Sequence, residues 1–315
     1  MDGNKFRDVV RSGTESYGSE RWYFLRELAQ NSRDADARSI RVLSGYLDEH
    51  TEYIRFEDDG IGMSKNHAEA YLFKLYASSK EDQKNTIGKY GIGFWTVLNF
   101  DPYAIIIESH HHHKSWAVQL NSKLEFESIP PTIKRQGTKL TFLRYSKYDS
   151  PTHYIRTVGD ELKRYCKYLT LKKNNSEQLP VLFNGKIINE QMSIPGPDTL
   201  SKTFRHKNLN GVVAFGEKPK VMLYSKGLPV WQGAVLTDLT DRASVSRQTQ
   251  FETGSGLAPV YLLNSSDIDI NFSRNSPIDN QGLEKMIHQA ENQLAALVFS
   301  FIRNTTPLSL PMLAK

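Results

Sequence analysis

One short helical segment carries three polar side chains that could act together on a phosphate. In "ELAQNSRDA", Glu27, Asn31 and Asp34 stand at positions i, i+4 and i+7, which places them on one face of a helix. The Asn31 amide oxygen could bind magnesium beside nucleotide phosphates. Glu27, one turn earlier, could orient and deprotonate an attacking water. The same spacing fits a solvated helix face with Asn31 and Asp34 on the surface, so both interpretations stay open.

A second segment, "EDDGIGM" at 57–63, has the composition of a base-binding loop. Gly60 and Gly62 would let a flat ring lie against bare backbone, while Asp58 accepts a hydrogen bond from an exocyclic amine. Such a buried acceptor would select adenine, because ligands without the donor leave the carboxylate unpaired. An acidic turn is the alternative. A calcium loop of the EF-hand type is excluded, since its spaced ligands and closing Glu are missing.

The third segment, "GKYGIGFW" at 88–95, places three glycines before bulky apolar residues. The sequence contains no G-x-x-x-x-G-K-[ST], and residues 88–93 read G-x-x-G-x-G, so neither familiar phosphate loop is present. Residues without side chains still allow backbone N–H groups to close on phosphate oxygens at a helix start. A tight turn before a buried helix explains the glycines equally well.

The elements that would position these segments suggest an α+β protein of two domains, since 315 residues exceed the usual size of one. Apolar residues recur at threes and fours from Glu20 to Ala37, which predicts a helix. Strands and helices then mix without strict alternation. "SIPGPDTLSK" is typical of a linker. We therefore predict a first domain at 1–192, a linker at 193–210 and a second, smaller domain at 211–315.

Composition narrows the class of protein. The chain is 39% hydrophobic and 24% charged, with a net charge of +5, which allows a polyanionic partner without arguing for one. A lone cysteine, Cys166, excludes an internal disulfide and fits a reducing compartment. No signal peptide and no run long enough to cross a bilayer is present. We expect a cytoplasmic protein without a membrane contact.

The ordered set "ELAQNSRDA", "EDDGIGM", "IGKYGIGFW" and "QGTKLTF" resembles the four ATP-site motifs of the GHKL superfamily. This superfamily comprises gyrase B, the ninety-kilodalton heat-shock chaperones, histidine kinases and MutL. The resemblance implies the Bergerat fold, a mixed sheet covered on one face by helices. It also implies a lid, here about 64–93, that folds over ATP and promotes dimerisation.

The resemblance further implies roles for single residues. Glu27 would be the general base, Asn31 the magnesium ligand and Asp58 the adenine acceptor. The base pocket, the lid contact and the phosphate-binding turn would be formed by Asp34, Gly60, Gly62, Met63, Thr138, Lys80, Gly88, Gly91, Ile92, Gly93 and Phe94.

The second half carries a weaker likeness to the middle domain of the heat-shock chaperones. "KVMLYSKGLPV" and "DIDINFSRNSP" are similar to a strand and an N-x-S-R loop of that domain. Its arginine reaches the γ-phosphate, and Arg274 matches it, although the following "NSPIDN" departs from the pattern. A surface arginine is the alternative. A lysine of the MutL or gyrase type is not assignable, with Lys186 and Lys226 as remaining candidates.

Three functions follow from these observations. The first is a magnesium-dependent ATPase that switches conformation, forms an ATP-dependent homodimer and acts on a protein client. The second is a nucleic-acid-associated ATPase of MORC or MutL character, which "DADA" and the basic surplus favour. The third is a nucleotide sensor that does not hydrolyse ATP, against which Glu27 counts.

Two further features receive no function from the sequence. The run "HHHH" at 110–113 could bind a transition metal, but it lies between two predicted strands and most simply forms an exposed hairpin turn. Cys166, with its neighbours Tyr165 and Tyr168, is predicted to be buried rather than reactive.

Overall fold

The computed structural model describes residues 20–72, 93–148, 150–175, 177–194, 200–239, 258–271 and 276–304. The chain divides into two compact units, Met1–Glu190 and Gln191–Lys315. The predicted linker is partly wrong, because residues 201–206 form a strand and the next strand starts at Leu209. The turn-forming residues of "SIPGPDTLSK" therefore precede the second sheet closely, and its last two residues begin it.

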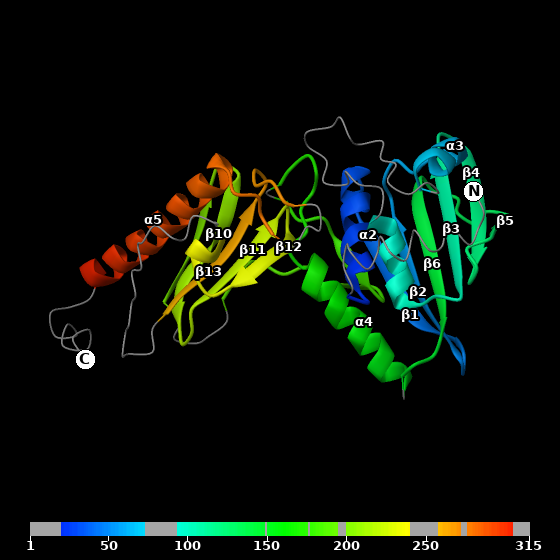
Figure 1. Ribbon diagram of the computed structural model, residues 1–315, viewed down its shortest axis with the longest axis horizontal. Helices are drawn as coiled ribbons and strands as arrows, with labels where there is room; N and C mark the ends of the chain where they lie inside the picture. Colours follow the sequence, from blue (N-terminus) through cyan, green and yellow to red (C-terminus); the bar gives the residue numbers. More distant parts are fainter. Residues whose placement is uncertain are drawn as a thin grey trace. The chain divides into compact units, whose positions relative to one another are not determined.

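The first unit is built on an eight-stranded mixed sheet in the order β5-β4-β3-β6-β2-β1-β7-β8 (Figure 1). Its strands are β1 (Ile40–Asp48), β2 (Thr51–Asp58), β3 (Ala104–His111), β4 (Lys114–Asn121), β5 (Phe126–Ser128), β6 (Gly137–Tyr145), β7 (Val181–Phe183) and β8 (Lys186–Ile187). Only β1 and β7 pair in parallel; the other neighbours are antiparallel. The edge strands β5 and β8 are short, which limits pairing with other chains.

Helices cover one face of this sheet (Figure 1). They are α2 (Tyr23–Asp34), α3 (Lys65–His67), the π-helical turn η1 (Ala68–Leu72), the 3-10 helix η2 (Gly93–Phe100) and α4 (Pro151–Cys166). α2 lies between η2 and α4 and contacts both. Phe24 of α2 packs against Phe142 of β6, with ring centroids 5.3 Å apart. This α+β architecture, a large mixed sheet with helices on one face, is that of the Bergerat fold.

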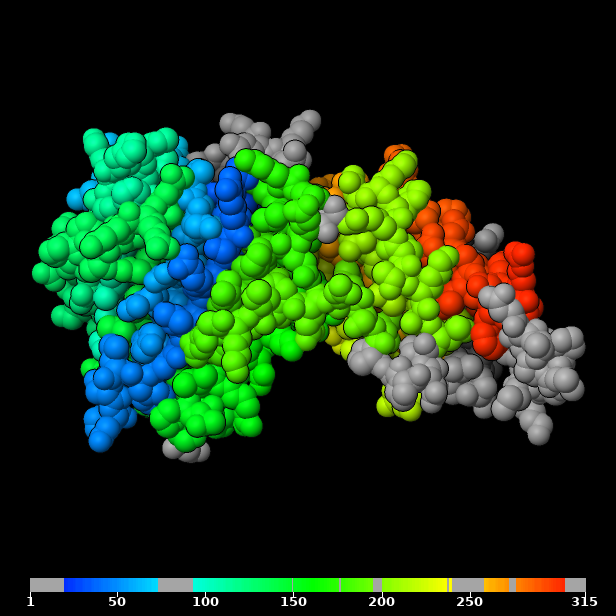
Figure 2. Space-filling model, turned by 180° about the vertical axis from the view of Figure 1, so that it is seen from behind, coloured from blue at the N-terminus to red at the C-terminus, as the bar shows by residue number. Residues whose placement is uncertain are grey.

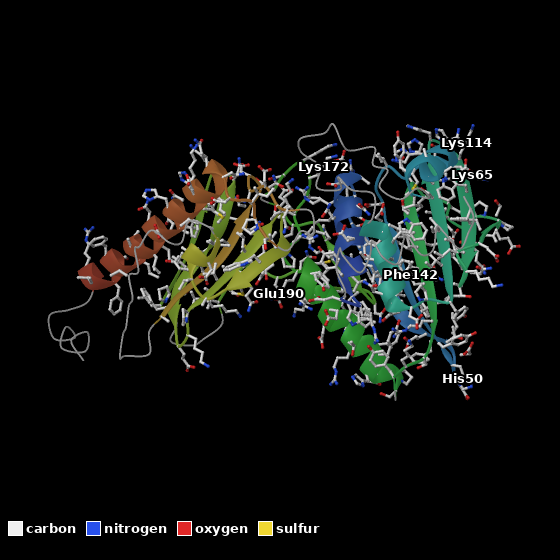
Figure 3. All side chains as sticks on the ribbon, viewed as in Figure 1. His50, Lys65, Lys114, Phe142, Lys172 and Glu190 are labelled. Atoms are coloured by element: carbon white, nitrogen blue, oxygen red, sulfur yellow. The ribbon has the colours of Figure 1, made fainter. Side chains whose placement is uncertain are left out.

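The two ends of this sheet carry different hairpins. Figure 2 shows the blue β1–β2 hairpin projecting at one end of the first unit and the teal β3–β4 hairpin at the opposite end. His50 marks the first end and Lys114 the second in Figure 3. The loop after β2 contacts the β3–β4 end, because Trp116 Nε1 donates to the Met63 carbonyl at 2.7 Å.

The second unit is a five-stranded sheet covered by one long helix (Figure 1). The elements are β9 (Ser201–His206), β10 (Leu209–Gly216), β11 (Lys220–Ser225), β12 (Leu228–Gly233), the 3-10 helix η3 (Leu236–Leu239), β13 (Ala258–Ser265) and α5 (Gln281–Asn304). The strand order is β12-β11-β13-β10-β9, with β11 and β13 parallel. Leu283, Met286, Ala290, Leu294 and Leu297 of α5 are buried in its core.

No helix in the described residues is long and apolar enough to cross a membrane.

Candidate functional site

The carboxylate of Glu27 is buried at the middle of α2. The side chain is 1% exposed and its Oε1 accepts a hydrogen bond from Arg26 Nη1 at 2.9 Å. α2 is enclosed almost all round, since ten of its twelve residues are buried. Glu27 and Asp34 are buried and Asn31 is half-buried. The solvated-face interpretation of this stripe is therefore wrong.

Gly93, the first residue of η2, lies directly against this carboxylate. A Cβ at position 93 would stand 2.1 Å from Glu27 Oε2, whereas ordinary contact begins at 3.4 Å. A side chain here would collide with the charged group, so the close approach of backbone to carboxylate requires glycine. The last glycine of "GKYGIGFW" thus places the start of η2 against Glu27.

Behind Gly93, the apolar residues of η2 anchor it in the core. Phe94 is 5% exposed and Trp95 is fully buried. Trp95 Nε1 donates to the Leu72 carbonyl at 3.1 Å, and Thr96 Oγ1 donates to the Gly93 carbonyl at 2.6 Å. A helix start fixed in this way can hold a bound group next to Glu27 without rearranging.

Asp58 ends β2 with its carboxylate held from two sides. Oδ2 accepts from Ser32 Oγ of α2 at 2.9 Å, and Oδ1 accepts from the Gly60 backbone N–H at 2.9 Å. Burial raises the pKa of Asp58 to about 6, and the charge of Asp59 adds to this, although hydrogen bonds from Gly60, Ser32 and Thr138 oppose it. A carboxylate has about four acceptor positions. These three donors leave capacity for one more, which is what an exocyclic amine would need.

The loop that follows Asp58 can only be formed with glycines. A Cβ on Gly60 would stand 2.8 Å from the Ala35 carbonyl, and one on Gly62 would stand 2.2 Å from the His110 carbonyl. Gly62 also has a φ of +66°, a conformation that side chains disfavour. Gly137, at the start of β6, packs directly against the Asp58 backbone, because a Cβ at position 137 would stand 2.0 Å from the Asp58 carbonyl.

Met63 and Thr138 lie where the loop meets the sheet. The Met63 N–H donates to Ser109 Oγ at 2.8 Å, and Ser109 Oγ donates to the Gly137 carbonyl at 3.1 Å. Thr138 is 9% exposed and pairs with Asp58 in the register of β2 and β6. The sheet register therefore brings residues from three distant segments, around 58, 109 and 138, to one place.

Asp34 is the last residue of α2. Its carbonyl accepts from Lys172 Nζ at 2.8 Å, and Figure 3 shows Lys172 beside the end of α2. The neighbouring Arg33 donates from Nε to the Thr170 carbonyl at 2.9 Å, and burial lowers the pKa of this guanidinium although Asp34 and Asp36 raise it. These contacts tie the C-terminal end of α2 to the segment around residues 170–172.

Among the described residues, no three His, Cys, Asp or Glu side chains converge to hold a metal ion. A magnesium ion at Asn31 would therefore take its remaining ligands from phosphates and water, which is how magnesium is usually held beside a nucleotide. The amide of Asn31, half-buried one turn from Glu27, suits that role in ligand type.

The comparisons with known proteins agree with this arrangement. A family model described as "Histidine kinase-, DNA gyrase B-, and HSP90-like ATPase" matches residues 20–141. Residues 20–141 therefore resemble the ATPase domain of the GHKL superfamily. All the described motifs, from α2 to β6, fall in or at the edge of this range.

Several chaperones named HtpG are similar to the chain. The protein of Wigglesworthia glossinidia brevipalpis is 25% identical over 239 residues, which are 65% of this chain and 35% of that protein. The Porphyromonas gingivalis protein is 23% identical over 192 residues, 53% of this chain and 27% of that protein. The Helicobacter hepaticus protein is 26% identical over 152 residues, 39% of this chain and 24% of that protein. The chain thus spans about a quarter to a third of these relatives.

Within residues 20–141, the structure brings several of the residues that the sequence singled out next to Glu27 or Asp58. Gly93 lies against Glu27, and Gly60, Gly62, Met63 and Thr138 belong to the segments around Asp58. Asn31 and Asp34 follow Glu27 along α2, and Phe94 follows Gly93 in η2. Five candidates lie outside the described residues, namely Lys80, Gly88, Gly91, Ile92 and Arg274, as do residues 73–92 of the expected lid. Lys186 is exposed at the start of β8, and Lys226 is half-buried in a turn with a φ of +56°.

Four residues that contact the candidate site residues were not singled out from the sequence. Arg26 pairs with Glu27, Ser32 holds Asp58, Ser109 joins Met63 to Gly137, and Gly137 supports the Asp58 backbone. Gly137 was visible as the glycine of "QGTKLTF". The other three had no signal, because an arginine or a serine is informative only when its partner is known.

The remaining expectations concern the histidines and the cysteine. The β3–β4 hairpin turns at His112 and His113, but His110 and His111 are half-buried residues of β3, so the predicted exposed turn is confirmed only for the second half of the run. Cys166, Tyr165 and Tyr168 are buried, and burial raises the pKa of the Cys166 thiol to about 12, which makes it unreactive.

Proposed function

We propose that this chain binds ATP with magnesium in the site between α2, the β2–α3 loop and η2, and hydrolyses it with Glu27 as the general base. The observation that carries the proposal is the position of the Glu27 carboxylate, buried against the backbone of Gly93 at the start of a helix. Helix starts favour phosphate groups. A base held there is placed to activate a water beside the terminal phosphate.

The base end of the nucleotide would lie at Asp58. Its remaining acceptor capacity suits the exocyclic amine of adenine, and Gly60 and Gly62 let the loop beside it pack closely against Ala35 and His110. A guanine in this place would present a carbonyl to the carboxylate and be rejected. Asn31 would hold the magnesium ion, which supplies charge neutralisation at the phosphates when bound.

We further propose that ATP binding closes a lid at about 64–93, pairs two protomers and prepares the chain to act on a protein client. The relatives described above are named chaperones, which favours a protein client over a nucleic acid. Arg274 remains our candidate for a second contact to the γ-phosphate. The described residues on either side of it, Asn271 and Ser276, are hydrogen-bonded to each other at 3.0 Å.

Phosphate release measured with magnesium and with excess EDTA tests the catalytic part. We expect release from ATP, none from GTP at the same concentration, and loss with EDTA. Sedimentation with and without a non-hydrolysable ATP analogue tests the switch, and we expect a dimer only with the analogue. A chain that binds no ATP would refute the proposal. Retardation of DNA that strengthens with ATP and weakens with salt would replace the protein client by a nucleic acid.

A further inference from the structure

The end of β3 runs alongside the base-binding loop, residue against residue. His111 Nδ1 lies 2.8 Å from the Ile61 carbonyl oxygen. The His110 carbonyl lies so close to Gly62 that a Cβ there would be 2.2 Å away. The next residue, Ser109, accepts from the Met63 N–H at 2.8 Å. Three consecutive residues of β3 thus hold three consecutive residues of the loop.

The proton positions in these contacts follow from the partners. A carbonyl oxygen accepts only, so His111 Nδ1 must carry the hydrogen that it donates to Ile61. The neighbouring His110 is in the same state, because Ser115 Oγ donates to the Ile133 carbonyl and must accept from His110 Nδ1. The first two histidines of the run are therefore oriented by specific bonds, whereas His112 and His113 form the exposed turn.

Ile61 is held from both sides, although its side chain is 51% exposed. Its N–H donates to the Ala35 carbonyl, just after α2, at 2.9 Å. Its carbonyl accepts from His111 of β3. The peptide groups flanking Ile61 are therefore fixed between α2 and the sheet. They connect Gly60, which bonds Asp58, to Gly62.

We propose that His111 is a positioning residue for base recognition, which sets the place of the Gly60–Gly62 backbone through the Ile61 carbonyl. This inference rests on the proposed binding of ATP at this site. Without the His111 bond, the loop would be held only from the α2 side at Ile61 and would sample positions in which the ring does not fit beside Asp58. Nucleotide affinity would fall, while the chemistry at Glu27 would not change.

Two substitutions at position 111 separate the hydrogen bond from the ring. His111→Phe keeps a planar ring and removes the donor. His111→Asn places an amide N–H close to where Nδ1 stands and keeps the donor. His113→Asn is the matched control, because Asn tolerates the φ of +65° at this turn residue and His113 is exposed.

Calorimetry with ATP and steady-state phosphate release measure the outcome on the full chain. We expect His111→Phe to weaken ATP binding about fivefold, as for the loss of one ordinary hydrogen bond, with kcat at saturating ATP unchanged. His111→Asn should restore most of the affinity, and His113→Asn should match the wild type. Without nucleotide, hydrogen exchange of the Ile61 and Gly62 amides should be faster in His111→Phe alone.

Each contrary result has a distinct meaning. If the wild type binds ATP and His111→Phe binds it with the same affinity, the positioning role is overturned and the proposed function stays intact. A His111→Asn variant as weak as His111→Phe would show that the donor is not what matters, and would also overturn it. A fall in kcat at unchanged affinity would contradict it in the same way. Absence of ATP binding by the wild type would overturn the proposed function and this inference together.

Discussion

Replacing Gly93 by alanine tests the contact on which the catalytic proposal depends. The added Cβ would stand 2.1 Å from Glu27 Oε2, and ordinary contact begins at 3.4 Å, so the two groups must separate by 3.4 − 2.1 = 1.3 Å. The Glu27 side chain is buried and bonded to Arg26, and η2 is held in the core by Trp95. The carboxylate or the helix start must therefore shift by about this distance.

A shift of this size has a calculable effect on hydrolysis. Misplacing a catalytic group by about 1 Å costs on the order of 100-fold in rate. The overpacked core also loses about 1–3 kcal/mol of stability. We expect Gly93→Ala to reduce kcat for phosphate release by about 100-fold while the protein still unfolds cooperatively.

A matched control separates catalysis from stability. Gly185→Ala adds a methyl group in open space, with nothing within 4 Å, but at a φ of +83°. It should cost about 1 kcal/mol through backbone strain without touching the site. We expect its kcat to equal that of the wild type. A Gly93→Ala protein with wild-type kcat would refute the reasoning, because the contact with Glu27 would then be irrelevant to turnover.

Two further predictions concern charges in the site. Burial raises the pKa of Asp58 to about 6, above the value of about 3.9 for an unfolded chain. Between these two pH values the folded protein binds a proton that the unfolded chain does not bind. The stability that Asp58 contributes therefore decreases as the pH rises from 4 to 6. The melting temperature of wild type relative to Asp58→Asn should therefore fall between pH 4 and pH 7, and a difference independent of pH would contradict this. Arg26→Met leaves the buried Glu27 carboxylate without its arginine partner and should lower the free energy of unfolding by about 3 kcal/mol in urea; a loss below 0.5 kcal/mol would show that the pair is unimportant.

Most of the regular structure was predictable from the sequence, because the periodicity of apolar residues is strong in this chain. The helix predicted from Glu20 to Ala37 contains α2, Tyr23–Asp34. The residues "GTKLTFLRY" also have the composition of a strand, and they form β6 from end to end. β9 and β12 were not predicted. β9 begins in a segment of turn-forming residues, and β12 contains Pro229, which is typical of edge strands, where no ladder hydrogen bond is lost.

The site was predictable as a list of residues but not as a set of contacts. Glu27, Asp58 and Gly93 could be named from spacing and residue type. That Gly93 touches Glu27 follows only from the packing of η2 on α2. That the histidine run contacts the loop after β2 follows only from the position of β3, which sets Ser109 to His111 beside residues 61–63. Long-range contacts of this kind leave no pattern in a single sequence.

The central claim is that Glu27 activates the water that attacks ATP, and the Glu27→Gln variant tests it most directly. Glutamine keeps the volume and an oxygen that can accept from Arg26, but it cannot take a proton. Single-turnover phosphate release should be measured with ATP saturating both proteins, after calorimetry has shown affinities within about threefold. We predict a rate at least about 100-fold below that of the wild type. Release at the wild-type rate would contradict the account.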